Sequence, residues 1–86
     1  MIENYMLFNN LPELDLHGQD RFSAVILADS FIKENLKMGN KLIKIVHGIG
    51  EGILKSEIHK FLKNNKLVKE YRIDIFNQGV TIVEIK

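Results

Sequence analysis

The stretch Lys41-Leu42-Ile43-Lys44-Ile45-Val46-His47-Gly48-Ile49-Gly50-Glu51-Gly52 decides the fold. Its first half is a short β-branched run typical of a strand, and from residue 48 to residue 52 glycine occupies every second position. Apolar residues then recur at helical spacing until Asn64-Asn65: Leu54, Ile58, Phe61 and Leu62. The stretch therefore predicts a strand that passes through a tight glycine turn into a helix.

The same order of strand and helix is predicted upstream. Residues 13–17 alternate polar and apolar side chains, which indicates a strand with one buried face, and Gly18 ends it. Asp20 is a good N-cap for a helix of about five turns that ends at Gly39-Asn40. The apolar stripe of this helix comprises Ala24, Val25, Ala28, Phe31, Ile32 and Leu36. Residues 1–10 lack a sustained period and are interpreted as an N-terminal arm, which leaves residues 11–86 as a single domain.

Downstream, residues 67–76 and 80–85 are predicted strands joined by Asn77-Gln78-Gly79, a three-residue hairpin loop with Gly79 at the left-handed position. The predicted order is β-α-β-α-β-β. Strands separated by a helix run parallel, and the closing hairpin adds an antiparallel strand. Two helices can cover only one face of the sheet, so we expect an α/β fold of the two-layer α+β sandwich type with a mixed four-stranded sheet.

Composition limits the function classes. The chain has 86 residues, a formal charge of +1 and no cysteine. It is therefore long enough for one domain and has no disulfide or thiolate site, which fits a cytoplasmic protein. No apolar stretch approaches the roughly 18 to 20 residues of a membrane span, and no basic residue precedes Arg21 as a leader would require, so we expect no membrane partner. A charge of +1 supplies no bulk attraction to polyanions.

The candidate catalytic residues lie where the first two predicted strands end, because each of these strands ends in histidine followed by glycine. If these strands are parallel neighbours, about 5 Å apart, Asp15, His17 and His47 share one rim of the sheet. Backbone N–H groups around Gly48, Gly50 and Gly52 could then converge on a phosphate at the helix N-terminus. The alternative is that these glycines only form a tight turn, since they match neither the dinucleotide-binding nor the Walker pattern.

Side-chain alternation raises a difficulty for this rim. Leu14 and Leu16 must face the helices, so Asp15 and His17 face the open side of the sheet. His47 shares the opposite parity with Ile43 and Ile45. The two imidazoles should then point to opposite faces unless the chain turns at His47.

The second helix also predicts a basic face, because Lys55, His59, Lys63 and Lys66 follow one another at near-helical spacing. This face is either merely solvated or a track for the phosphate backbone, and His59 is expected at the surface. Asp15, His17 and His47 are also conceivable metal ligands, but strand-end residues of doubtful orientation do not make a closed site. We therefore predict no bound structural metal, while a weakly bound divalent cation such as magnesium remains open.

The two histidine motifs together resemble the Smr (small MutS-related) domain family. Leu14-Asp15-Leu16-His17 matches its first signature and His47-Gly48-Ile49-Gly50-Glu51-Gly52 its second, while Leu54-Lys55 and Gly79-Val80-Thr81 match flanking positions. The resemblance implies a fold similar to the C-terminal domain of translation initiation factor three, with sheet order 1-2-4-3.

It also implies nucleic-acid binding and, in many members, endonuclease activity on RNA or on branched DNA. As a hypothesis, one histidine removes a proton from the attacking hydroxyl while the other protonates the leaving oxygen. Asp15 would orient His17, and the glycine turn with Lys55 would hold the phosphoryl charge. The alternatives are a non-catalytic adaptor that docks on the ribosome or structured RNA, and a protein-interaction module that uses the open sheet face.

Two residues depart from the family pattern. Ile49 stands where many relatives have lysine or arginine, and Glu51 stands where threonine or serine is common. A carboxylate beside a phosphate is repulsive unless it points away or a divalent cation lies between them. The departures therefore predict weaker binding than in those relatives.

Overall fold

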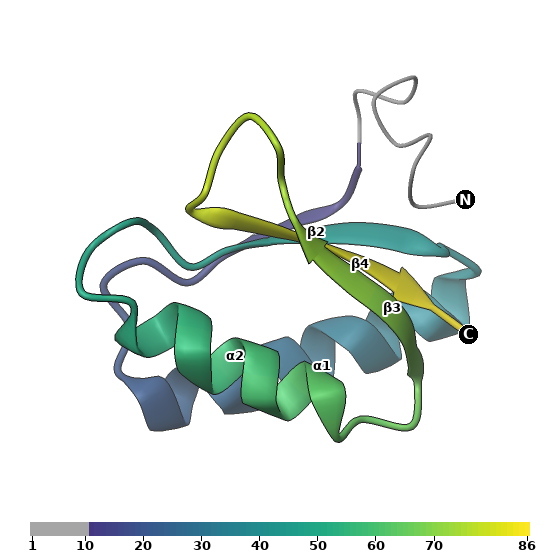
Figure 1. Cartoon of the computed structure of the whole chain (residues 1–86). Helices are drawn as coiled ribbons and strands as arrows, with labels where there is room; N and C mark the ends of the chain where they lie inside the picture. The colour runs from purple at the N-terminus through teal and green to yellow at the C-terminus, as the bar shows by residue number, and fades with distance from the viewer. Residues whose placement is uncertain (1–10) are drawn as a thin grey trace.

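The computed structural model describes residues 11–86, so the predicted arm, residues 1–10, lies outside the described residues. The elements are β1 (Glu13–Asp15), α1 (Arg21–Met38), β2 (Leu42–Val46), α2 (Ile53–Lys63), β3 (Val68–Ile73) and β4 (Val80–Ile85). The sheet order is β1-β2-β4-β3, with β1 parallel to β2 and β4 antiparallel to both of its neighbours. Both helices cover one face of the sheet (Figure 1). The predicted two-layer sandwich and its strand order are confirmed.

The two faces of the sheet bury different residues. Ile43 and Ile45 of β2 and Leu16 after β1 are fully buried in the cluster beneath the helices. On the opposite face a smaller cluster contains Leu42, Val80 and Ile82, with Leu11 and Val46 packed against it. Side chains of β2 therefore alternate between the faces as the period-two pattern predicted. Within residues 11–86, neither helix combines the length with the apolar composition that a membrane span requires.

The ends of α1 follow its capping residues. The Asp20 carboxylate accepts hydrogen bonds from the backbone N–H groups of Phe22 and Ser23, at 3.0 and 2.8 Å. At the other end, Gly39 adopts the left-handed conformation with φ 79°. Leu36 was expected in the apolar stripe but is 38% exposed, whereas Asn35 is buried. Asn35 fits this place because its side chain donates to the Phe31 carbonyl and accepts from Asn40.

The strand predicted to reach Phe76 ends earlier, at Ile73. The Asp74 carboxylate accepts the Phe76 N–H at 2.8 Å, which turns the chain out of the sheet and leaves Phe76 75% exposed. The connection to β4 is therefore longer than the predicted three residues. Gly79 does not have a positive φ either. Its lack of a side chain serves a close approach instead, because a Cβ there would lie 3.0 Å from the Gly48 carbonyl carbon.

Candidate functional site

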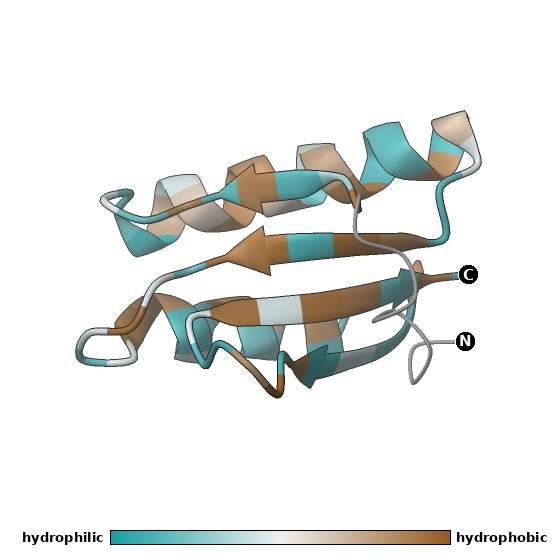
Figure 2. Cartoon of the chain, turned by 90° about the horizontal axis from the view of Figure 1, so that it is seen from above, coloured by the Kyte–Doolittle hydropathy of each residue, from teal (hydrophilic) through white to brown (hydrophobic). Residues whose placement is uncertain are grey.

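Three loops meet at one end of the sheet: residues 16–20, 47–52 and 74–79 (Figures 1 and 2). The first two are brought together by the parallel pairing of β1 with β2, in which Asp15 lies opposite Val46. The Leu16 N–H then donates to the Val46 carbonyl at 2.7 Å. As a result His17 lies beside the glycine turn, and a Cβ added to Gly48 would be 3.7 Å from the His17 Cβ.

Asp15 and His17 form an exposed pair at this end. The Asp15 carboxylate accepts from the His17 Nδ1 at 2.7 Å and from the His17 backbone N–H at 3.1 Å. The hydrogen bond and the negative charge of Asp15 raise the pKa of His17, and the same hydrogen bond lowers the pKa of Asp15. The His17 side chain is 75% exposed. Because Nδ1 is bound to the carboxylate, Nε2 is the ring nitrogen left to act on another molecule.

His47 lies on the helix side of the sheet and is only 4% exposed. Its Nε2 lies 2.8 Å from the Thr81 hydroxyl and its Nδ1 lies 3.1 Å from the Gly48 carbonyl oxygen. Burial lowers the pKa of His47. The structure therefore does not bring His47 into one open pocket with Asp15 and His17. The reason is the side-chain parity noted in the sequence. The chain does not turn until after His47, because the His47 backbone N–H still donates to the carbonyl oxygen of Gly79, the residue before β4.

His59 is not on the exposed basic face predicted for α2. Its Nε2 lies 2.7 Å from the same Thr81 hydroxyl, and its ring makes edge contacts with Tyr71 and His47 at centroid distances of 5.1 and 5.9 Å. Burial lowers the pKa of His59, which disfavours its cationic form. Lys63 and Lys66 are exposed, so the face retains these two cations without the histidine.

The glycine turn has fewer free donors than its sequence suggests. Gly48 and Gly52 have φ 85° and 82°, a region that favours glycine. The Gly48 N–H, however, donates to the Gly79 carbonyl at 3.0 Å, so the amide of Gly48 is occupied and cannot serve as the predicted phosphate donor. No side chain caps α2, whose N-cap is Gly52. The amides available for an anion are therefore those after Gly48 and in the first turn of α2.

These amides border a cavity of about 260 Å³ lined by residues 47–55, including Glu51 and Lys55. A smaller cavity of about 120 Å³ on the same turn is also lined by Gln78 from the loop before β4. Ile49, where the resemblance to the family led us to expect a basic residue, is 76% exposed here. The turn thus offers one cation, Lys55, and one carboxylate, Glu51.

Sequence reasoning assigned no role to Thr81 or Gln78 and misplaced that of Gly79. Thr81 acts through contacts with residues far apart in the chain, His47 and His59, and Gln78 is brought to the turn by the fold. The one signal available was the Gly79-Val80-Thr81 pattern, which includes Gly79 and Thr81 but not their partners, and no signal pointed to Gln78. Within residues 11–86, no three His, Cys, Asp or Glu side chains are grouped so that they could hold a metal ion.

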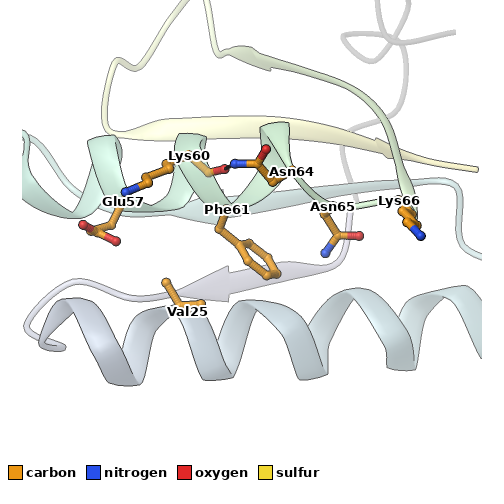
Figure 3. Close-up of a pocket in the computed structure, with 7 residues that line it drawn as sticks. All are labelled: Val25, Glu57, Lys60, Phe61, Asn64, Asn65 and Lys66. Atoms are coloured by element: carbon orange, nitrogen blue, oxygen red, sulfur yellow. Dashed lines mark hydrogen bonds between the residues drawn. The ribbon is translucent and has the colours of Figure 1, made fainter.

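A separate groove of about 550 Å³ lies between the helices (Figure 3). Phe61 of α2 points toward Val25 of α1 and forms its apolar part, and Glu57, Lys60 and Lys66 contribute charges of both signs. The groove contains no histidine and no part of the glycine turn. It therefore lacks the groups expected to act on a phosphodiester.

The fold and the site define a small α+β domain with a carboxylate–histidine pair beside a glycine turn. A sequence model of the Smr domain matches residues 14–86, and the chain belongs to the Smr domain family. It is 41% identical over 86 residues to endonuclease MutS2 of Clostridium kluyveri and 39% identical over 77 residues to endonuclease MutS2 of Clostridium tetani. These alignments cover 96% and 86% of this chain but only 11% and 10% of the relatives.

Solved structures have the same fold. The Smr domain of Thermus thermophilus MutS2 superposes with a TM-score of 0.86 at 26% identity, covering 88% of this chain and 99% of that one. YdaL, a stand-alone small MutS-related protein from Escherichia coli, shares the fold with a TM-score of 0.87 at 21% identity, covering 99% of this chain and 74% of that one.

Proposed function

We propose that this Smr domain binds nucleic acid at the end of the sheet that carries Asp15, His17 and the glycine turn, and that it cleaves phosphodiester bonds there as an endonuclease. The observation that carries the proposal is the exposed Asp15–His17 pair beside Gly48, with His17 Nδ1 2.7 Å from the carboxylate. Membership of the Smr family and similarity to proteins named endonuclease MutS2 support it.

In this proposal His17 is the general acid. Asp15 holds Nδ1 and favours the cationic ring, so Nε2–H can be donated to the leaving oxygen as the phosphorus–oxygen bond breaks. The attacking oxygen forms the new bond to phosphorus and loses its proton to solvent. His17 then recovers a proton from solvent. RNA is the favoured substrate because its 2′-hydroxyl supplies a nucleophile within the chain, and branched DNA would require attack by water.

The phosphoryl charge is held by the amides that follow Gly48, by the N-terminal end of α2 and by Lys55. His47 is buried, and both of its ring nitrogens lie close to protein oxygens. In this proposal His47 holds the glycine turn and takes no part in proton transfer. Glu51 opposes an anion in the same cavity, and a weakly bound divalent cation such as magnesium would reduce this repulsion.

Cleavage assays test the proposal. Labelled single-stranded RNA, structured RNA and branched DNA are incubated with the protein, with magnesium or with EDTA. We expect His17→Ala to lower the cleavage rate by about 10² or more, which is the usual contribution of a general acid, and to leave binding nearly unchanged. Lys55→Met should instead weaken binding. Lys33→Met is the matched control, because Lys33 pairs with Asp29 on α1, outside the site.

Each outcome decides between function classes. Cleavage that disappears with His17→Ala supports the endonuclease. Tight binding without products under every condition would favour the non-catalytic adaptor on structured RNA or the ribosome. Cleavage that persists undiminished in His17→Ala would contradict the role assigned to His17.

A further inference from the structure

A chain of three side chains connects α2 with the glycine turn through the interior. His59 Nε2 lies 2.7 Å from Thr81 Oγ1, which lies 2.8 Å from His47 Nε2. The other nitrogen of His47, Nδ1, lies 3.1 Å from the Gly48 carbonyl oxygen. Thr81 and His47 are almost fully buried, at 0% and 4% exposed, so water does not easily replace these contacts.

Hydrogen-bond chemistry fixes the direction of this chain. The Gly48 carbonyl can only accept, so His47 Nδ1 must carry the hydrogen. Burial favours neutral His47, whose Nε2 is then an acceptor and receives the Thr81 hydroxyl hydrogen. The Thr81 oxygen in turn accepts from His59 Nε2–H. Every donor has an acceptor, and among the described residues no buried side-chain nitrogen or oxygen lacks a partner.

The chain of hydrogen bonds ends at Gly48, and the peptide groups on both sides of this residue are held. The Gly48 N–H, in the peptide group before it, donates to the Gly79 carbonyl at 3.0 Å, and the Gly48 C=O, in the peptide group after it, accepts from His47. In a trans peptide the C=O of one residue and the N–H of the next point in opposite directions. A fixed Gly48 carbonyl therefore fixes the Ile49 N–H, which points away from the imidazole. Ile49 also lines both cavities of the turn.

We propose that Thr81 and His59 are positioning residues for the phosphate cradle. Through His47 they hold the Gly48 carbonyl away from the bound anion, so that the Ile49 amide donates to the phosphoryl oxygen instead. Without this restraint the Gly48–Ile49 peptide can rotate, because φ of Gly48 is 85° and glycine also tolerates other conformations. A rotated peptide would present a carbonyl oxygen to the phosphate. The inference about the cradle rests on the proposed function.

The test compares variants that keep or remove one hydrogen-bonding atom. Thr81→Val removes the hydroxyl at nearly constant volume, and Thr81→Ser keeps it. His59→Leu removes the donor on α2, and His59→Gln can replace it with an amide N–H. Circular dichroism shows whether each variant is folded. Because His59 is only half-buried, its variants keep the proposal testable if Thr81→Val does not fold.

The first readout needs no nucleic acid. Long-range ¹H–¹⁵N NMR of the histidine rings should show His47 protonated at Nδ1 and His59 at Nε2 in the wild type. Thr81→Val should mix the tautomers of His47, and it should shift the Ile49 amide resonance and speed its hydrogen exchange. Thr81→Ser should preserve the wild-type pattern. His59→Leu should disturb the His47 tautomer and the Ile49 amide as Thr81→Val does, and His59→Gln should preserve the wild-type pattern. An unchanged His47 tautomer and Ile49 amide in folded Thr81→Val or His59→Leu would overturn the proposal.

The second readout is binding of a labelled single-stranded DNA in EDTA. We expect Thr81→Val and His59→Leu to bind about three- to tenfold more weakly, as the loss of one hydrogen bond predicts, with recovery in Thr81→Ser and His59→Gln. Normal binding despite a disturbed tautomer would overturn the link to the cradle. If the wild-type protein binds neither this DNA nor the RNAs and branched DNA of the cleavage assay, with or without magnesium, the proposed function fails, while the NMR comparison still decides whether Thr81 and His59 position the turn.

Discussion

At the scale of single residues, Asp15 governs the protonation of His17. Its carboxylate accepts two hydrogen bonds from His17, one from the ring and one from the backbone. We expect Asp15→Asn to lower the pKa of His17 toward its ordinary value, because the charged acceptor is lost. NMR titration of the His17 ring protons measures this shift. The titration of His59, on the other side of the sheet, is the internal control, and an unmoved His17 midpoint would contradict the pairing.

Gly79 makes a second prediction at this scale. A Cβ there would lie 3.0 Å from the carbonyl carbon and 3.2 Å from the Cα of Gly48, and both are backbone atoms that cannot easily move. We expect Gly79→Ala to destabilise the domain by about 1–3 kcal/mol and to shift the Gly48 amide resonance. Urea unfolding and NMR measure the two effects.

Gly39→Ala is the comparison for Gly79→Ala. Gly39 has open space around it but a φ of 79°, so alanine there should cost about 1 kcal/mol through backbone conformation alone. The Gly48 resonance should stay in place. A Gly79→Ala variant as stable as the wild type would contradict the close approach of the Gly48 and Gly79 backbones.

At the scale of elements, α2 presents different residues on its inner face and at its outer end. Its inner face packs Ile58 and Leu62 into the core and presents His59 to Thr81. Its outer end and the following turn expose Lys63 and Lys66. Sequence spacing placed His59 with these lysines, because helical periodicity locates a residue on a face but does not show where the sheet begins to cover it.

The two lysines give the element-scale prediction. If they contact the phosphate backbone, the double variant Lys63→Ala/Lys66→Ala should bind all nucleic acids more weakly, and the slope of log affinity against log salt should fall by about 1 to 2. Fluorescence anisotropy at several salt concentrations measures this. Lys33→Met on α1 is the charge control. An unchanged slope would mean that this face is only solvated.

The loop between β3 and β4 shows why part of the site could not be predicted. Ile75 and Phe76 are residue types that favour a strand. The Asp74 carboxylate, however, accepts a hydrogen bond from the Phe76 N–H, and β3 ends at Ile73. By contrast, α1, α2, β2 and β4 follow local periodicity and caps and were predicted close to their observed bounds.

At the scale of the whole molecule, the sequence located the Asp15–His17 pair and the glycine turn. Its prediction that His47 joins them at one open rim is not met, and the difficulty raised by side-chain parity gives the reason. The sequence could not reveal that His47, His59 and Thr81 share hydrogen bonds, because these residues come from three elements that are far apart in the chain. It also could not show that the Gly48 amide is bound by Gly79. Such contacts depend on the packing of β4 between β2 and β3, which no local pattern contains.

The three histidines give the domain opposing responses to pH. Folding lowers the pKa of His47 and His59 through burial, so the unfolded chain binds more protons and stability should fall as pH drops below about 6.5. His17 acts in the opposite sense, because its raised pKa adds stability that is lost as pH rises through its folded value. We therefore expect His17→Ala to lose more stability than the wild type between pH 7.5 and 5.

Urea unfolding at several pH values tests this response. The slope of stability against pH should be steeper in His17→Ala, since the opposing contribution has been removed. A slope that is flat or reversed in this variant would contradict the burial of His47 and His59 as neutral rings.

The place of β4 has a consequence for synthesis on the ribosome. This strand follows all the other elements in the chain, yet it lies between β2 and β3 and supplies Thr81, while Gly79 immediately before it bonds the glycine turn. Chains emerge from the amino end first. The nascent domain consequently lacks the contacts of Thr81 with His47 and of Gly79 with the glycine turn until β4 has been translated and inserted.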